Sequence, residues 1–316
     1  FIAAGLLLPA ATSAAACDAG AYRANDREIV AVTARANAQG AIDYRYTFLD
    51  GRRGAVGKGA DVECTNGQVR VRQAGGATAA WPRMRFVETP ARFDSHGEKL
   101  AGMLLEPSDA GGKRPLVIFV HGSERTSPIG GAYAYLLAAQ GLSVFVYDKR
   151  GTGDSEGVYT QNFELLADDA AAAAWEARRL AKGRYQRFGF FGGSQGGWVA
   201  PLAAKISKAD FVAVGFGLVM SPLDEDRDQV ASELVAKGYG AGAVAKARAV
   251  TDATGDVIAS HFAGGYEQLA AIKRRFGREP HTAWRTRRPS TADHRTGLAS
   301  PRGATPSSTR RCSDGD

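Results

Sequence analysis

RFGFFGGSQGGW, residues 187–198, is the stretch of this 316-residue chain that decides its fold. Residues 187–191 predict a buried strand, and residues 195–206 predict an alanine-rich helix. The pattern Gly-x-Ser-x-Gly lies between them at residues 192–196. A sharp strand-to-helix turn presents the serine hydroxyl at a helix N-terminus, where backbone N–H groups can stabilise a developing negative charge. The stretch therefore predicts that Ser194 is a nucleophile.

Strands and helices alternate on both sides of this stretch. Short apolar runs predict buried strands, and the segments between them have helical composition. Alternation with short connections predicts a parallel sheet that carries helices on both faces. The predicted strands are 115–120, 142–147, 187–191 and 211–220, the predicted helices between them are 131–140, 163–182 and 195–206, and residues 86–106 predict a preceding strand pair.

The sequence His121-Gly122-Ser123-Glu124 follows the first of these strands. In a sheet of this kind, the loop after this strand supplies a second backbone N–H group to a developing oxyanion. We expect the N–H groups of Ser123 and Gln195 to form this oxyanion hole. We expect His121 to hold the loop in place rather than to act as a base.

The sequence DKRGTGDS, residues 148–155, follows the strand at 142–147. Gly151 and Gly153 resemble the start of a dinucleotide-binding fingerprint, but the third glycine of that fingerprint is replaced by Glu156. The sequence therefore predicts no nucleotide cofactor.

Together, the HG loop, DKRGTGDS and GGSQGGW resemble the α/β-hydrolase superfamily. The resemblance is greatest to bacterial serine aminopeptidase- or esterase-like hydrolases related to prolyl oligopeptidases and dienelactone hydrolases. It covers about residues 86–280. It implies an α/β fold with a mostly parallel sheet, and hydrolysis of a small acyl, ester or peptide substrate through an acyl-Ser194 intermediate. An ester hydrolase, an aminopeptidase or other amidase, and a non-catalytic binding domain remain open alternatives.

The superfamily pattern also requires an acid and then a histidine after the serine. No apolar run precedes His281 or His294, so the last strands of the sheet are expected to be missing. The adjacent Asp293 and His294, or Asp224 as the acid, are alternatives for the missing partners, whereas His261 is expected to be structural. Without a base, the rate would fall by about 10⁴–10⁶-fold, and the chain would be catalytically crippled.

The sequence divides into five segments. They are a partial signal peptide at 1–16, a small β-rich module at 17–84, the α/β core at 85–221, a helical cap insertion at 222–280 and a basic tail at 281–316.

The apolar residues 1–16 lack an amphipathic period and end in small residues, as the end of a secretory signal does. We therefore expect export to the periplasm or the medium. Lipid anchoring through Cys17 is the alternative. Export would permit a Cys17–Cys64 disulfide and would leave Cys312 unpaired, and the three cysteines have no zinc-ligand spacing.

The basic charge of the chain is concentrated at its end. Residues 273–316 hold eleven lysines and arginines against four acidic residues, which accounts for the whole net charge of +7. A neutral body argues against a nucleic-acid partner. The segment 281–316 has no strand or helix pattern, and a natural disordered tail and a shifted reading frame are both open interpretations. The sequence also contains no transmembrane stretch, and nothing in it sets the oligomeric state.

Overall fold

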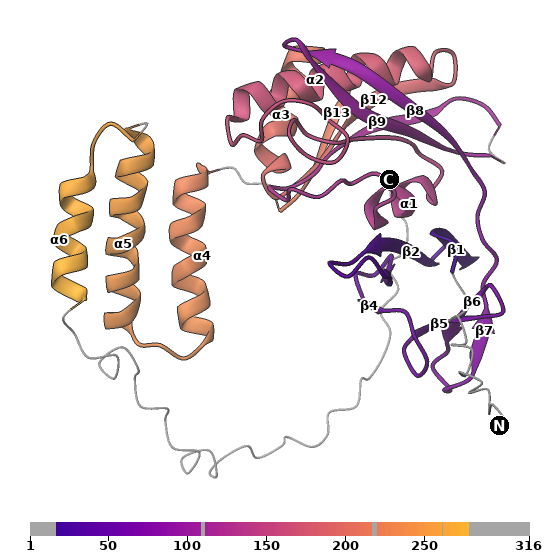
Figure 1. Cartoon of the computed structure of the whole chain (residues 1–316), viewed down its shortest axis with the longest axis horizontal. Helices are drawn as coiled ribbons and strands as arrows, with labels where there is room; N and C mark the ends of the chain where they lie inside the picture. Colours follow the sequence, from indigo (N-terminus) through magenta and orange to yellow (C-terminus); the bar gives the residue numbers. More distant parts are fainter. Residues whose placement is uncertain (1–16, 109–110, 217–219, 261, 278–316) are drawn as a thin grey trace, which may run out of the picture. The chain divides into compact units, whose positions relative to one another are not determined.

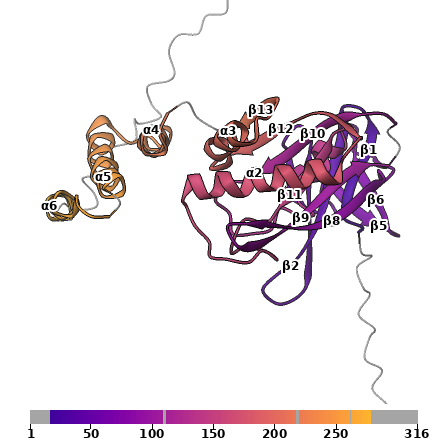
Figure 2. The ribbon, with the colours of Figure 1, turned by 90° about the horizontal axis from the view of Figure 1, so that it is seen from above.

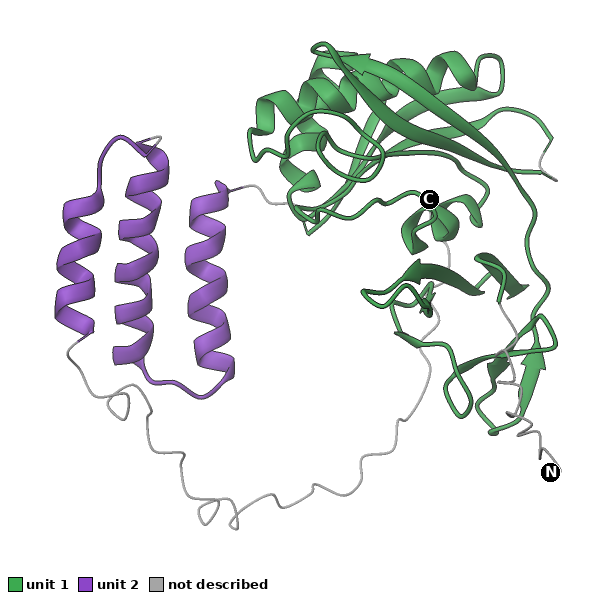
Figure 3. Cartoon of the chain, viewed as in Figure 1, with its two compact units in different colours: residues 1–219 green, residues 220–316 purple. Residues whose placement is uncertain are grey.

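The computed structural model describes residues 17–277 except 109–110, 217–219 and 261. The predicted signal peptide, His261 and the tail with His281, Asp293, His294 and Cys312 lie outside the described residues. The chain forms two compact units, residues 1–219 and residues 220–316 (Figure 3).

The first unit begins with two small antiparallel sheets. Their inner faces share a core that includes Val30, Phe48 and Trp81. Cys17 and Cys64 form a disulfide with a Cα–Cα distance of 5.8 Å, which confirms the predicted pairing. The strands, in sheet order, are β1 (Gly20–Asn25), β2 (Glu28–Ala36), β3 (Ile42–Phe48) and β4 (Arg53–Ala55), then β5 (Val62–Thr65), β6 (Gln68–Arg72) and β7 (Thr78–Ala80).

A six-stranded mixed sheet follows, with the order β13-β12-β10-β11-β9-β8; its strands are labelled in Figure 2. Its four strands β11, β10, β12 and β13 pair in parallel, whereas β9 runs antiparallel to both of its neighbours. This arrangement confirms the predicted α/β-hydrolase architecture. The strands are β8 (Phe86–Ser95), β9 (Glu98–Pro107), β10 (Arg114–Val120), β11 (Ser143–Tyr147), β12 (Tyr185–Gly193) and β13 (Phe211–Gly215).

Helices cover both faces of this sheet (Figures 1 and 2). The helices α2 (Phe163–Leu180) and α3 (Gly196–Ser207) pack on the face that presents Leu116, Ile118 and Val120 of β10. The helix α1 (Ala132–Ala138) packs on the opposite face against Phe119, in a core that it shares with β1 and β2. Alternate residues of β10 therefore anchor helices on opposite sides, as the pleat of a strand requires.

The strand β13 lies at one edge of the sheet and is less buried than its apolar sequence suggests. Val212 and Val214 are 39% and 43% exposed, and Phe216, directly after the strand, is 81% exposed. Apolar composition alone could not distinguish this edge strand from the central ones, because exposure depends on what lies beside a strand.

The second unit contains three helices among its described residues: α4 (Pro222–Ala236), α5 (Ala241–Ala259) and α6 (Tyr266–Phe276). The Ser221 hydroxyl accepts a hydrogen bond from Asp224 N, which caps the start of α4. The helices confirm the helical prediction for this segment, and its role as a cap stays a prediction. No helix in the described part of the chain is both long and apolar enough to cross a membrane.

The closest backbone approach at the turn is between Gly196, the first residue of α3, and β10. A Cβ atom at Gly196 would lie 1.9 Å from the Val120 carbonyl oxygen, and one at Gly192 would lie 2.0 Å from Gly196 O. Only glycine at both positions lets the strand turn directly into the helix.

We expect Gly196→Ala to lower the free energy of unfolding by about 3 kcal/mol, because backbone rather than a mobile side chain must move. Chemical denaturation would measure this change. The matched control is Gly193→Ala in the same turn, where the nearest atom would be Gly215 O at 3.6 Å. Equal stability of the two variants would contradict the tight-contact interpretation.

Candidate active site

Ser194 occupies the turn between β12 and α3, as predicted. Its φ is +52°, a left-handed conformation that is unusual for a residue with a side chain. Its N–H donates to Gly215 O at 3.2 Å, and Gly197 N donates to Ser194 O at 2.7 Å. The turn is thus held from both sides, and Ser194 is exposed at its tip. Strain of this kind is found at functional sites, where it fixes the direction of a side chain.

A cavity of about 330 Å³ lies beside Ser194. Three aromatic rings, those of Phe119, Tyr133 and Phe191, form a packed cluster on its wall, with centroid distances of 5.5 to 6.2 Å. Phe216 also lines the cavity. These walls favour an apolar or aromatic group next to the serine hydroxyl.

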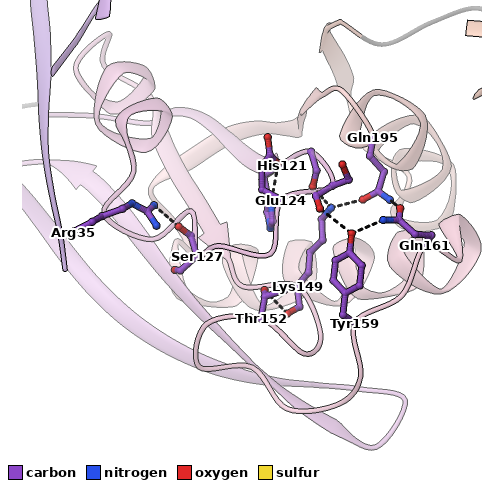
Figure 4. A network of polar contacts seen from close by, with 11 residues as sticks. Arg35, His121, Glu124, Ser127, Lys149, Thr152, Tyr159, Gln161 and Gln195 are labelled. Carbon is purple, nitrogen blue, oxygen red and sulfur yellow. Dashed lines mark hydrogen bonds and ion pairs between the residues drawn. The ribbon is translucent and has the colours of Figure 1, made fainter. Parts of the chain in front are cut away.

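The N-terminal module contributes one residue to this cavity. Arg35 of β2 lines it and donates from Nη2 to the Ser127 carbonyl oxygen at 2.5 Å (Figure 4). Glu124 lines the cavity as well. The cavity therefore combines apolar walls with one basic and one acidic side chain. Nothing in the sequence around Arg35 signalled this role, because the contact spans 92 residues.

The N–H groups of the two predicted oxyanion donors have no hydrogen-bond partner among the described residues. Gln195 is the N-cap residue of α3, directly after Ser194. Ser123 lies in the loop after β10, and its neighbour Gly122 lines the cavity with Ser194. The structure thus leaves both N–H groups available for an external acceptor.

A buried polar network links this loop to the turn (Figure 4). Lys149, 1% exposed, donates from Nζ to Gly122 O at 2.5 Å and to Gln195 Oε1 at 2.5 Å. The Gln195 amide donates in turn to Gln161 Oε1, and Gln161 donates to the Tyr159 hydroxyl. Burial lowers the pKa of Lys149 to about 8, although Glu124 opposes this shift. The sequence did not predict this network, although Lys149 follows the carboxyl end of a predicted buried strand. Ligand sites of α/β sheets lie at the carboxyl ends of the strands.

Other residues of the DKRGTGDS loop stabilise the loop and join it to α2. Arg150 forms a bidentate, buried ion pair with Asp169 of α2, at 2.8 and 2.6 Å. Asp148 Oδ2 accepts from Asp154 N at 2.9 Å. A Cβ atom at position 153 would lie 2.1 Å from the Asp148 carboxylate, so packing within the loop requires glycine at this position.

The model of the serine aminopeptidase family, S33, matches residues 111–247, which include the turn, the HG loop and Lys149. The matched residues, like the sheet order described above, are those of an α/β-hydrolase. No curated protein sequence matches it.

Solved structures also resemble this α/β-hydrolase. A hypothetical protein of Pseudomonas aeruginosa is 20% identical with a TM-score of 0.36, and the match covers 49% of this chain and 56% of that one. An esterase of Pyrococcus furiosus is 21% identical with a TM-score of 0.38, covering 48% and 56%. A serine hydrolase without a lid from Xanthomonas campestris is 19% identical with a TM-score of 0.34, covering 45% and 70%. The chain thus spans about half the length of the first two structures.

The structure describes two histidines of this α/β-hydrolase, and neither has the environment of a serine-activating base. His96 lies in the turn between β8 and β9, and its Nε2 lies 2.9 Å from Asp168 Oδ2 of α2. Asp224, a candidate acid, belongs to the cap of α4. Among the described residues, no group of three His, Cys, Asp or Glu side chains could hold a metal ion.

His121 belongs to the HG loop and is buried, 5% exposed. Burial, together with the charge of Lys149, lowers its pKa to about 3. Its Nδ1 lies 3.7 Å from Glu124 Oε2, and its Nε2 is buried with no hydrogen-bond partner among the described residues. A buried, neutral imidazole fits the structural role expected for His121.

The depressed pKa of His121 predicts a specific acid sensitivity. The pKa of His121 is about 3 in the folded protein and about 6.5 in the unfolded chain. The contribution of neutral His121 to the free energy of unfolding is therefore fully present above pH 6.5 and is lost as the pH falls toward 3. We expect His121→Asn to remove a slope of about 1.4 kcal/mol per pH unit in this range. Urea unfolding at several pH values would measure it.

His96→Asn is the control, because this histidine side chain is 53% exposed. An unchanged slope in His121→Asn, with both variants folded, would show that His121 does not stay neutral in the folded protein.

Proposed function

We propose that this α/β-hydrolase cleaves carboxylic esters or related acyl compounds through an acyl-enzyme intermediate on Ser194. The observation that carries the proposal is the exposed serine with φ +52°, at the N-terminus of α3 and on the wall of a cavity. These features support a nucleophile elbow, a turn that would hold the hydroxyl toward the substrate.

The proposed reaction has two steps. Ser194 Oγ forms a bond to the acyl carbon while its proton passes to a general base that neither His96 nor His121 supplies. The carbonyl oxygen becomes an oxyanion between the N–H groups of Ser123 and Gln195. The C–O bond to the alcohol then breaks, and the alcohol leaves with a proton. Water adds to the acyl carbon in the second step, releases the acid and restores the hydroxyl of Ser194.

The cavity supports a small acyl group as the substrate. Its volume of about 330 Å³ is near the lower end of small-molecule sites. The aromatic cluster of Phe119, Tyr133 and Phe191 lies on its wall, and Arg35 offers a positive charge to a substrate with a polar end. An aminopeptidase or amidase, as the name of the matching family suggests, uses the same serine and differs only in the leaving group.

A second candidate is a binding domain that keeps the fold but does not turn over substrate. The two described histidines support it, because His121 is buried and His96, in the turn between β8 and β9, contacts Asp168 of α2. In that case Ser194 would have its cavity and its N–H donors but no partner to take its proton.

A fluorophosphonate probe tests the first proposal against the second. We expect the folded protein to be labelled, and Ser194→Ala to lose at least about 10⁴-fold of the labelling rate, because the nucleophile is removed. Hydrolysis of p-nitrophenyl butyrate, compared with alanine p-nitroanilide, would then separate an esterase from an aminopeptidase.

Ser108→Ala is the matched control, because the hydroxyl of Ser108 donates to Arg85 O at 3.1 Å and Ser108 does not line the cavity beside Ser194. Folded protein that is not labelled would reject the acyl-enzyme and favour the binding domain.

We also propose that the protein is exported to an oxidising compartment. The Cys17–Cys64 disulfide supports this location, because it closes a separation of 47 residues and would contribute about 4 kcal/mol by loop-closure entropy. We expect both cysteines to resist alkylation in intact cells until a reductant is added. Free, alkylated thiols in the native protein would argue for a reducing compartment.

A further inference from the structure

The peptide group between Gly122 and Ser123 has a charged partner at one end and an open end at the other. Its oxygen, Gly122 O, accepts from Lys149 Nζ at 2.5 Å. Its N–H belongs to Ser123 and has no partner among the described residues. In a trans peptide the C=O and N–H bonds point in opposite directions within one plane. A contact that fixes the oxygen therefore also fixes the direction of the Ser123 N–H.

Lys149 binds the second donor residue as well. Its Nζ donates to Gln195 Oε1 at 2.5 Å, and the Gln195 amide is held further by Gln161. Tyr159 donates its hydroxyl to Ser123 O at 2.8 Å, so the peptides before and after Ser123 are both held. One ammonium group thus connects the loop after β10 to the turn after β12 (Figure 4).

The position of Lys149 is costly for the fold. Among the described residues, no carboxylate lies within 4.0 Å of its Nζ, and the side chain is 1% exposed. A buried ammonium whose close partners are neutral oxygens loses hydration without forming an ion pair. Burial accordingly holds the pKa of Lys149 near 8, well below its ordinary value. Costly polar groups of this kind cluster at functional sites.

We propose that Lys149 is a positioning residue that aligns the N–H groups of Ser123 and Gln195 and increases their positive polarisation toward a bound oxyanion. The inference rests on the proposed function, because it assumes that these N–H groups receive the oxyanion. The ammonium acts through the Gly122 carbonyl and the Gln195 amide, and it does not touch the substrate. A charge on the carbonyl oxygen draws electrons from the peptide, which makes the N–H at the other end a stronger donor.

Binding of an anion to protein that lacks the nucleophile tests this role without requiring turnover. In the Ser194→Ala protein, phenylphosphonate binding can be followed by NMR. We expect Lys149→Met to weaken it by roughly tenfold or more, because both donors lose their alignment and polarisation. Lys149→Arg, which keeps the charge, should recover part of the loss. Lys205→Met on the exposed side of α3 removes the same charge and should bind like the parent.

A second measurement uses the intact lysine, so it does not depend on a buried variant that fails to fold. The amide ¹⁵N shift of Ser123 should move as the pH rises through the pKa of Lys149, near 8. The titratable or charged groups that face Lys149 or its network are His121, Glu124 and Arg125 of the HG loop and Tyr159. Repeating the titration in Tyr159→Phe separates the lysine from the phenol.

Unchanged phosphonate affinity in folded Lys149→Met, or a Ser123 shift that does not follow the lysine, would overturn the inference. Loss of fluorophosphonate labelling with intact, Lys149-dependent phosphonate binding would instead reject only the proposed acyl-enzyme.

Discussion

The site depends on the absence of side chains where α3 meets β10. The backbone of Gly196 lies against the Val120 carbonyl, and the backbone of Gly192 lies against Gly196. This contact leaves the chain no room for a gradual turn, so Ser194 takes a left-handed conformation with its side chain exposed. The position of the serine, its neighbour Gln195 and the cavity wall all follow from this backbone packing.

A second level of organisation is electrostatic. The loop after β10 and the turn after β12 are joined through Lys149, and the loop after β11 is joined to α2 through the Arg150–Asp169 pair. Two adjacent residues of one motif thus join the loop after β11 to different elements. The first uses neutral oxygens and the second uses a carboxylate, which explains why Lys149 keeps a low pKa while that of Arg150 is raised by its bond to Asp169.

Local sequence patterns predicted much of this structure. The strands at 115–120, 142–147 and 187–191 and the turn at Ser194 followed from apolar runs and glycine spacing, and these are properties of neighbouring residues. The contacts of Lys149 with Gln195 and of Arg35 with Ser127 did not follow, because they join residues 46 and 92 positions apart. The exposure of β13 was missed for a related reason, since no local pattern tells an edge strand from a central one.

The contact of Arg35 with Ser127 has a consequence for how the protein folds. One wall of the cavity comes from β2, whereas Ser194 lies in the turn after β12. Contacts that are distant in sequence require closure of a long loop, and they slow the search for the native state. We therefore expect the cavity to be completed late in folding. The serine turn needs only the packing of β12 and α3 on β10 and β13, whereas the wall from β2 is in place only when the N-terminal sheet has docked.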